Sequence, residues 1–202
     1  MNITNTAELR EHYGEPSELV QRKVLPKLDI HCRNLIEASP FLVIATADET
    51  GRTDASPRGD GPGFVAVLDE HTLLLPDRPG NRRLDTHRNI LANPYVGIIF
   101  FIPGMNETLR VNGRAELITD KERLATLAVR GKLPLAGLLI HVEEAFLHCA
   151  KALIRSDLWN PEKHIPRSTF PSMGKMIADQ IKGIDADEAE RIVQESIEKR
   201  LY

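Results

Sequence analysis

Arginines gather where the sequence predicts the start of a helix, an arrangement suited to binding an anion. Prolines and a glycine interrupt the preceding apolar run, and Asn81 then stands at the expected N-cap of a helix over residues 82–91. Arg82 and Arg83 would lie in the first helical turn, with Arg78 just upstream. Free backbone N–H groups and the positive end of the helix dipole disfavour cations there, by a few tenths of a kcal/mol each. A phosphate would remove this conflict by accepting hydrogen bonds from amides and guanidinium groups together; the alternative is a solvated basic turn.

A second group of polar residues follows helical spacing in the segment 144–159. Taken as one helix, this segment has a broad apolar face and, opposite it, a narrow stripe of His148, Lys151, Arg155 and Trp159. The chain has a single tryptophan, and aromatic and arginine side chains are favoured at the centres of interfaces. The stripe therefore indicates a contact surface, and the alternative is an ordinary solvated helix face.

The two cysteines do not indicate a metal site. Cys32 and Cys149 each follow a histidine, but neighbouring residues on a helix point about 100° apart. No C-x-x-C or H-x-x-x-H pair supports either dipeptide, so we expect reduced core cysteines and no bound metal. No Ser-His-Asp set or carboxylate pair stands out. His87 lies one helical turn from Arg83 and could reach a phosphate there, although a surface histidine is the simpler interpretation.

The composition restricts the classes of ligand and location. The 202 residues hold 26 Lys and Arg against 29 Asp and Glu, a formal net charge of −3, so no global basic field points to nucleic acid. No apolar run approaches the roughly 18 residues of a membrane-spanning helix, and the first residues lack the basic and apolar regions of a signal peptide. We therefore expect a cytoplasmic protein that binds a small, local anion and has no membrane or nucleic-acid partner.

The expected secondary structure changes from helices to strands near residue 40. Residues 1–38 show helical spacing and form an expected helical arm. Short strands follow, mostly joined by tight turns, and two helices interrupt them without the regular alternation of βαβ units. Residues 39–160 are therefore expected to form an antiparallel barrel, and residues 161–202 a proline-punctuated linker with two closing helices. The expected strands cover residues 41–47, 52–57, 64–68, 72–75, 95–102, 108–118 and 138–142.

Several motifs together resemble one protein family. They are F-L-V-I-A-T-A, D-A-S-P-R-G-D, L-L-L-P-D-R-P-G-N-R-R, the pair Asn93-Pro94, L-R-V-N-G-R-A, and H-V-E-E-A-F-L-H-C-A-K-A-L-I-R-S-D-L-W. In this order the chain resembles the FMN-binding split-barrel family typified by pyridoxamine 5′-phosphate oxidase, and specifically its oxidase-related branch. The resemblance covers roughly residues 36–161. It implies a mainly β fold with flanking helices (α+β), an antiparallel split β-barrel that binds FMN as a homodimer.

The resemblance also implies which residues hold the cofactor at the homodimer interface. Residues of the second barrel strand line the flavin, residues of a strand-to-helix turn hold its phosphate, and the partner subunit closes over the ring. Matched to this sequence, these three groups are Ser56 and Arg58, then Arg78, Asn81 and Arg82, and finally Lys151, Arg155 and Trp159 of the partner.

The sequence departs from the vitamin-B6 oxidases themselves. Their serine-arginine-lysine phosphate signature is replaced by R-P-G-N-R-R, and their C-terminal substrate-binding segment is not recognisable. FMN binding is thus expected more firmly than oxidation of pyridoxamine phosphate. Three interpretations stay open: an FMN-dependent oxidoreductase acting on a small-molecule substrate, a non-catalytic flavin, haem or other ligand-binding protein, and a structural dimer that binds only inorganic phosphate.

Overall fold

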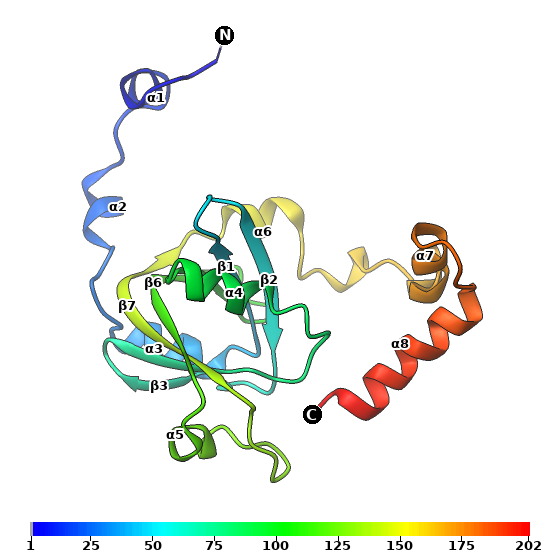
Figure 1. Ribbon diagram of the computed structural model, residues 1–202. Coiled ribbons are helices and arrows are strands. Elements are labelled where there is room, and N and C mark those ends of the chain that lie inside the picture. The colour runs from blue at the N-terminus through cyan, green and yellow to red at the C-terminus, as the bar shows by residue number, and fades with distance from the viewer. Residues whose placement is uncertain (1) are drawn as a thin grey trace.

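Seven antiparallel strands form the centre of the computed structural model, which describes residues 2–202 (Figure 1). They belong to one sheet with the order β2-β1-β5-β6-β7-β4-β3, in which β2 and β3 are the edges. The predicted mainly β, antiparallel fold with flanking helices is confirmed. The strands are β1 Phe41–Ala47, β2 Thr53–Gly59, β3 Ala66–Asp69, β4 Thr72–Pro76, β5 Tyr95–Phe101, β6 Thr108–Ile118 and β7 Gly137–His148.

The sheet encloses one apolar core because inward side chains alternate along its central strands. In β1, Leu42 and Ile44 are fully buried, and their register partners across β5, Phe100 and Ile98, are buried with them. Burial of each such side chain contributes roughly 1.5–3 kcal/mol, which favours this pairing over a one-residue slip that would expose all of them. The strands predicted at residues 41–47 and 95–102 are confirmed as β1 and β5.

The helices differ in how they meet this core. Helix α3 packs into it through Cys32 and Ile36, whereas α1 and α2 bury no residue and extend away from the barrel (Figure 1). Helices α7 and α8 pack against each other beside the barrel (Figure 1). The helices are α1 Thr6–Tyr13, α2 Glu18–Arg22, α3 Ile30–Ala38, α4 Asp85–Ala92, α5 Lys121–Ala125, α6 Lys151–Ser156, α7 Met173–Gln180 and α8 Ala186–Arg200, with 3₁₀ turns at Pro161–Lys163 and Arg167–Thr169.

The helix expected over residues 82–91 begins later, so the prediction that Asn81 is its N-cap is wrong. Helix α4 starts at Asp85, and Leu84 occupies its N-cap position in a left-handed conformation. The side chain of Asn81 instead accepts a hydrogen bond from the backbone N–H of Arg83, at 3.0 Å. This local Asx turn competes with helix formation, so the arginines lie in a turn before the helix and not in its first turn.

The helix expected over residues 144–159 is also wrong. Residues 144–148 belong to β7, which pairs with β6 as far as His148 opposite Thr108. Hydrogen bonding to a neighbouring strand overrides the helical spacing, as tertiary context commonly does. Only Lys151–Ser156 is helical, as α6, and Trp159 lies beyond its end. The stripe inferred from one continuous helix therefore does not exist.

No helix between residues 2 and 202 has the length and apolar character needed to cross a membrane.

Candidate functional site

A cavity of about 640 Å³ opens beside the edge strand β2. Its walls are β2, the turn of residues 77–84, the first turn of α4 and the end of α8. Five of the eight residues expected to bind a cofactor line it: Ser56, Arg58, Arg78, Asn81 and Arg82.

Strand β2 presents a polar row to this cavity. Alternate residues of a strand face the same side, so Asp54, Ser56 and Arg58 share one face. The Arg58 guanidinium donates to Ser56 Oγ and, at 3.2 Å, to Thr86 Oγ1 at the start of α4. Burial lowers the pKa of Arg58 from its ordinary value, while the carboxylates of Asp77 and Asp54 act in the opposite direction. Arginine remains charged under such a shift. Because it donates hydrogen bonds to the hydroxyl groups of Ser56 and Thr86, this half-buried cation is held mainly by neutral partners.

The turn of residues 77–84 carries two residues with left-handed backbones. Arg82 has φ 60° and Leu84 has φ 61°, a region that costs a non-glycine residue roughly 1–2 kcal/mol. Arg83 pairs with Asp85 at 2.7 Å, but the guanidinium of Arg82 has no ion pair or hydrogen bond within residues 2–202. Arg82 is therefore available to a ligand.

Arg78 differs, because most of its guanidinium is already engaged. Its Nε donates to Asp60 Oδ2 at 2.6 Å, and its Nη1 donates to the carbonyl oxygen of Leu127 at 2.9 Å. The pair is largely buried, with 16% of the Arg78 side chain and 6% of the Asp60 side chain exposed. Burial alone would raise the pKa of Asp60, but hydrogen bonds from the Tyr202 hydroxyl, the Gly61 amide and Arg78 outweigh it and lower this pKa. Only Nη2 of Arg78 has no protein partner among the described residues.

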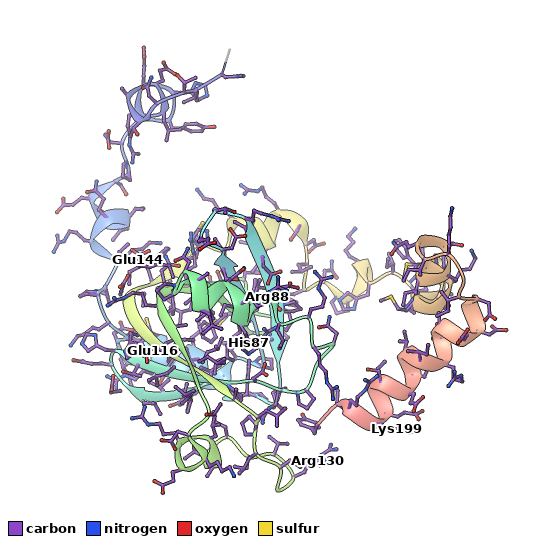
Figure 2. The ribbon with its side chains drawn as sticks, in the orientation of Figure 1. His87, Arg88, Glu116, Arg130, Glu144 and Lys199 are labelled. Carbon is purple, nitrogen blue, oxygen red and sulfur yellow. The ribbon has the colours of Figure 1, made fainter. Side chains whose placement is uncertain are left out.

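A histidine and a carboxylate also face the cavity together. His87 Nε2 lies 3.4 Å from Asp77 Oδ1, and only 10% of the His87 side chain is exposed. His87 belongs to α4 (Figure 2) and is buried, so the simpler interpretation of a surface histidine is wrong. A histidine oriented by a carboxylate is an arrangement that can hold or move a proton.

The three residues expected from the partner subunit do not reach this cavity within their own chain. Lys151 and Arg155 are exposed on α6. Trp159 is half-buried, and its indole Nε1 donates to the carbonyl oxygen of Met105 at 2.8 Å, which ties the end of α6 to the β5–β6 turn. Within one chain, these three residues are therefore separate from the other five.

The cavity also includes residues that sequence reasoning missed. Thr86 links β2 to α4, and Lys199, Arg200 and Tyr202 form one wall. Thr86 lies in the helix predicted over 82–91 and carried no separate signal. Tyr202 donates to Asp60 Oδ1 at 2.8 Å across 142 residues of sequence, a contact that no local pattern can indicate.

The site suits an anionic group more than metal-dependent chemistry. Arg58, Arg82 and Arg200 contribute cations without a carboxylate bound directly to any of them. Among residues 2–202, no three His, Cys, Asp or Glu side chains are grouped closely enough to hold a metal ion. Guanidinium groups and a hydroxyl converging on one cavity match the geometry and charge of a phosphate.

Comparison with known proteins identifies the family. The sequence pattern described as pyridoxamine 5′-phosphate oxidase matches residues 28–149, more than half of the chain, so this protein belongs to that family. The match ends before α6, and residues 150–202 lie outside it.

Solved structures resemble part of the chain. HupZ from Group A Streptococcus is 23% identical, covering 59% of this chain and 93% of its own, with a TM-score of 0.47. A provisionally named pyridoxamine 5′-phosphate oxidase from Lactobacillus delbrueckii is 22% identical, covering 60% and 95%, with a TM-score of 0.49. A structure described as an F420 reductase is 20% identical, covering 56% and 94%, with a TM-score of 0.42. No curated protein has significant sequence similarity to the chain.

Proposed function

We propose that this member of the pyridoxamine 5′-phosphate oxidase family binds FMN and uses it to oxidise or reduce a small organic molecule. The observation that carries the proposal is the meeting of Ser56 and Arg58 from β2 with Arg82 from the turn of residues 77–84 in one cavity. Arg82 has no protein partner among residues 2–202, and Arg58 is held mainly by hydroxyl groups, so both guanidinium groups can donate hydrogen bonds to a phosphate without breaking an ion pair.

In this proposal the bound flavin supplies the redox chemistry, and the protein supplies position and charge. Arg82 and Arg58 neutralise the phosphate, and Nη2 of Arg78 adds one donor. Asn81 shapes the turn through its bond to the Arg83 amide and does not need to touch the cofactor. His87, oriented by Asp77, is the group placed to give a proton to a substrate or take one from it.

Replacing Arg82 with alanine tests the phosphate site. A charge-assisted contact contributes roughly 1.5–3 kcal/mol, so Arg82→Ala should weaken FMN binding by about tenfold or more. Arg88→Ala is the matched control, because Arg88 is exposed on α4 and does not line the cavity. Equal FMN titration curves for Arg82→Ala and the parent protein would reject the assignment. Flavin absorbance in the purified protein would also exclude a dimer that binds only inorganic phosphate.

We further propose that the protein is a homodimer whose partner subunit contributes Lys151, Arg155 and Trp159 to each flavin site. The three residues do not line the cavity of their own chain, which supports a role in the site of the partner. Light scattering should give about twice the monomer mass, and a stable monomer of 22.6 kDa at micromolar concentration would contradict the proposal.

Mixing two defective chains tests the sharing directly. Arg82→Ala and Trp159→Ala chains should form heterodimers with one intact and one doubly damaged site, and so recover close to half of the parental high-affinity FMN sites. No recovery would place both residues in one subunit's pocket or remove Trp159 from the site.

Turnover distinguishes an oxidoreductase from a flavin-binding protein without catalysis. Bound FMN that is reduced by a nicotinamide donor and reoxidised by an added acceptor would support the enzyme. His87→Gln should then reduce the rate more than it reduces FMN affinity, because His87 is assigned to proton transfer and not to phosphate binding.

A further inference from the structure

The end of α8 forms a wall of the cavity although it lies far from β2 in sequence. Lys199, Arg200 and Tyr202 all line the cavity. Figure 1 shows α7 and α8 beside the barrel with the end of α8 directed back toward it, and Figure 2 shows Lys199 on the last turn of that helix. The segment of residues 199–202 is thus the part of this helical extension that meets the cavity.

Tyr202 fixes this segment through three contacts, one with Asp60 and two with the loop between α5 and β7. Its hydroxyl donates to Asp60 Oδ1 at 2.8 Å, just after β2. The guanidinium of Arg130 lies over its ring at 4.9 Å, and Lys132 Nζ donates to its carbonyl oxygen at 2.9 Å. Because the three contacts involve the hydroxyl, the ring and the backbone, they fix both the position and the orientation of the residue.

The carboxylate that receives Tyr202 is itself rigid. Only 6% of the Asp60 side chain is exposed, and its other oxygen accepts from Arg78. The same carboxylate therefore joins the turn of residues 77–84 to the segment 199–202. Movement of either wall of the cavity has to disturb a largely buried ion pair or its hydrogen bond to Tyr202.

Arg200 is the cation that this anchoring leaves for a ligand. Lys199 pairs with Glu195 at 2.8 Å, but the Arg200 guanidinium has no ion pair or hydrogen bond in the described part of the chain. Arg82 is in the same condition on the turn of residues 77–84. Two arginines without partners thus line one cavity from segments 118 positions apart in the numbering, 200 against 82. Cations in the last turn of a helix are common because they suit its dipole, but that effect does not require one to line a cavity.

We propose that the segment 199–202 is part of the anion site, with Arg200 as a further phosphate-binding cation beside Arg82 and Arg58, and with Tyr202 as the residue that positions it. This inference rests on the proposed FMN site and deepens it, because it assigns a binding role to a segment outside the family match. The ligand class is a phosphate monoester, to which Arg82 and Arg200 would each contribute a guanidinium group.

The test compares two flavins that differ only in the phosphate. FMN and riboflavin are titrated by flavin fluorescence. The readout is the affinity for FMN divided by the affinity for riboflavin, which measures the contribution of the phosphate. Arg200→Gln should reduce this ratio by about fivefold or more, as the loss of a charge-assisted contact predicts. Tyr202→Phe keeps the ring over Arg130 but removes the bond to Asp60, and should reproduce part of that loss. In the Arg200→Gln protein, Tyr202→Phe should add little, because its effect acts through Arg200.

Two control variants make the same kinds of chemical change at positions that do not line the cavity. Lys182→Gln removes an exposed cation between α7 and α8, and Tyr13→Phe removes a hydroxyl from α1, so neither should change the ratio. An unchanged ratio in folded Arg200→Gln protein would overturn the assignment of Arg200. Additive losses from Tyr202→Phe and Arg200→Gln would overturn the positioning role of Tyr202.

Failure of the proposed function would be recognised separately. If the parent protein binds neither flavin, inorganic phosphate is titrated and followed by phosphorus NMR. Weaker phosphate binding by Arg200→Gln than by Lys182→Gln would support Arg200 as part of an anion site that does not bind FMN. Equal phosphate binding by the two variants, or no phosphate binding by the parent protein, would overturn the assignment of Arg200 to an anion site.

Discussion

Replacing Asp60 with asparagine should show that Arg78 has a structural role in addition to any contact with a ligand. In the folded protein Asp60 Oδ2 accepts from Arg78 Nε, and Oδ1 accepts from both the Gly61 amide and the Tyr202 hydroxyl. The asparagine side chain of the Asp60→Asn variant would keep one acceptor oxygen. If that oxygen stays with Gly61 and Tyr202, the amide nitrogen faces Arg78, so a donor meets a donor and the charge of Arg78 loses its partner.

The expected loss follows from burial. Removing one partner of a buried ion pair costs roughly 3–5 kcal/mol, and partial exposure of Arg78 should reduce this to about 2–4 kcal/mol. The control is Asp85→Asn, because the Arg83–Asp85 pair leaves 75% of the Arg83 side chain exposed. Exposed pairs contribute about 0–1 kcal/mol, and loss of an acid from the first turn of α4 adds a few tenths.

The dependence on pH gives a second check of the same interaction. The folded pKa of Asp60 lies below its ordinary value, so its ionised form stabilises the fold. This contribution is fully present above the unfolded pKa of about 3.9 and is lost as the pH falls through the lower folded pKa. The stability difference between the parent protein and Asp60→Asn should therefore be largest near neutral pH and shrink below about pH 4. Urea unfolding at pH 7 that gives a difference under about 1 kcal/mol would refute the role of Asp60 as a buried clamp.

Two further predictions concern the barrel and its cysteines. Gly113→Ala should destabilise the fold by about 3 kcal/mol or more in urea unfolding, because the added Cβ would lie 2.0 Å from the carbonyl oxygen of His141 across the β6–β7 bulge. The control is Gly61→Ala, because the added Cβ would meet open space there. Similar stabilities for the two variants would contradict this geometry. Maleimide labelling of the native protein at pH 8, followed by mass spectrometry, should modify the exposed Cys149 but not Cys32. The reason is that Cys32 is buried, and burial raises the pKa of its thiol to about 11. Two rapid adducts without denaturant would contradict this expectation.

Most of the strands were predictable because their patterns do not depend on distant residues; the second half of β7 is the exception. Buried and exposed residues alternate in β1, β5 and β6, and turn residues separate the members of each hairpin. The edge strand β2 contains Pro57, which is tolerated there because one side of the strand has no ladder to satisfy. Local patterns did not connect Ser56 and Arg58 with Arg82; the family resemblance assigned them to one site, and all three line one cavity.

The errors occur where a distant partner or an unusual backbone decides the structure. Glu144 and Leu147 fit a helical spacing, but their backbones pair with Asn112 and Leu109 of β6, which are more than thirty positions earlier. Leu84 in a left-handed conformation delays α4, and nothing about a leucine in a sequence indicates that conformation. The hydrogen bond from Tyr202 to Asp60 depends on the path of two whole helices and is likewise absent from any local pattern.

The arginines of the turn can be sorted only by their contacts. In the sequence, Arg78, Arg82 and Arg83 are equivalent cations beside an expected helix start. In the structure, Arg78 is neutralised by a buried carboxylate and Arg83 by the half-buried Asp85, so neither needs a ligand to compensate its charge. Arg82 is left with its charge uncompensated, on a backbone that costs energy to maintain. Because an unpaired exposed arginine is inexpensive but a left-handed backbone is not, the conformation that aims Arg82 at the cavity is the stronger physical argument for a bound anion.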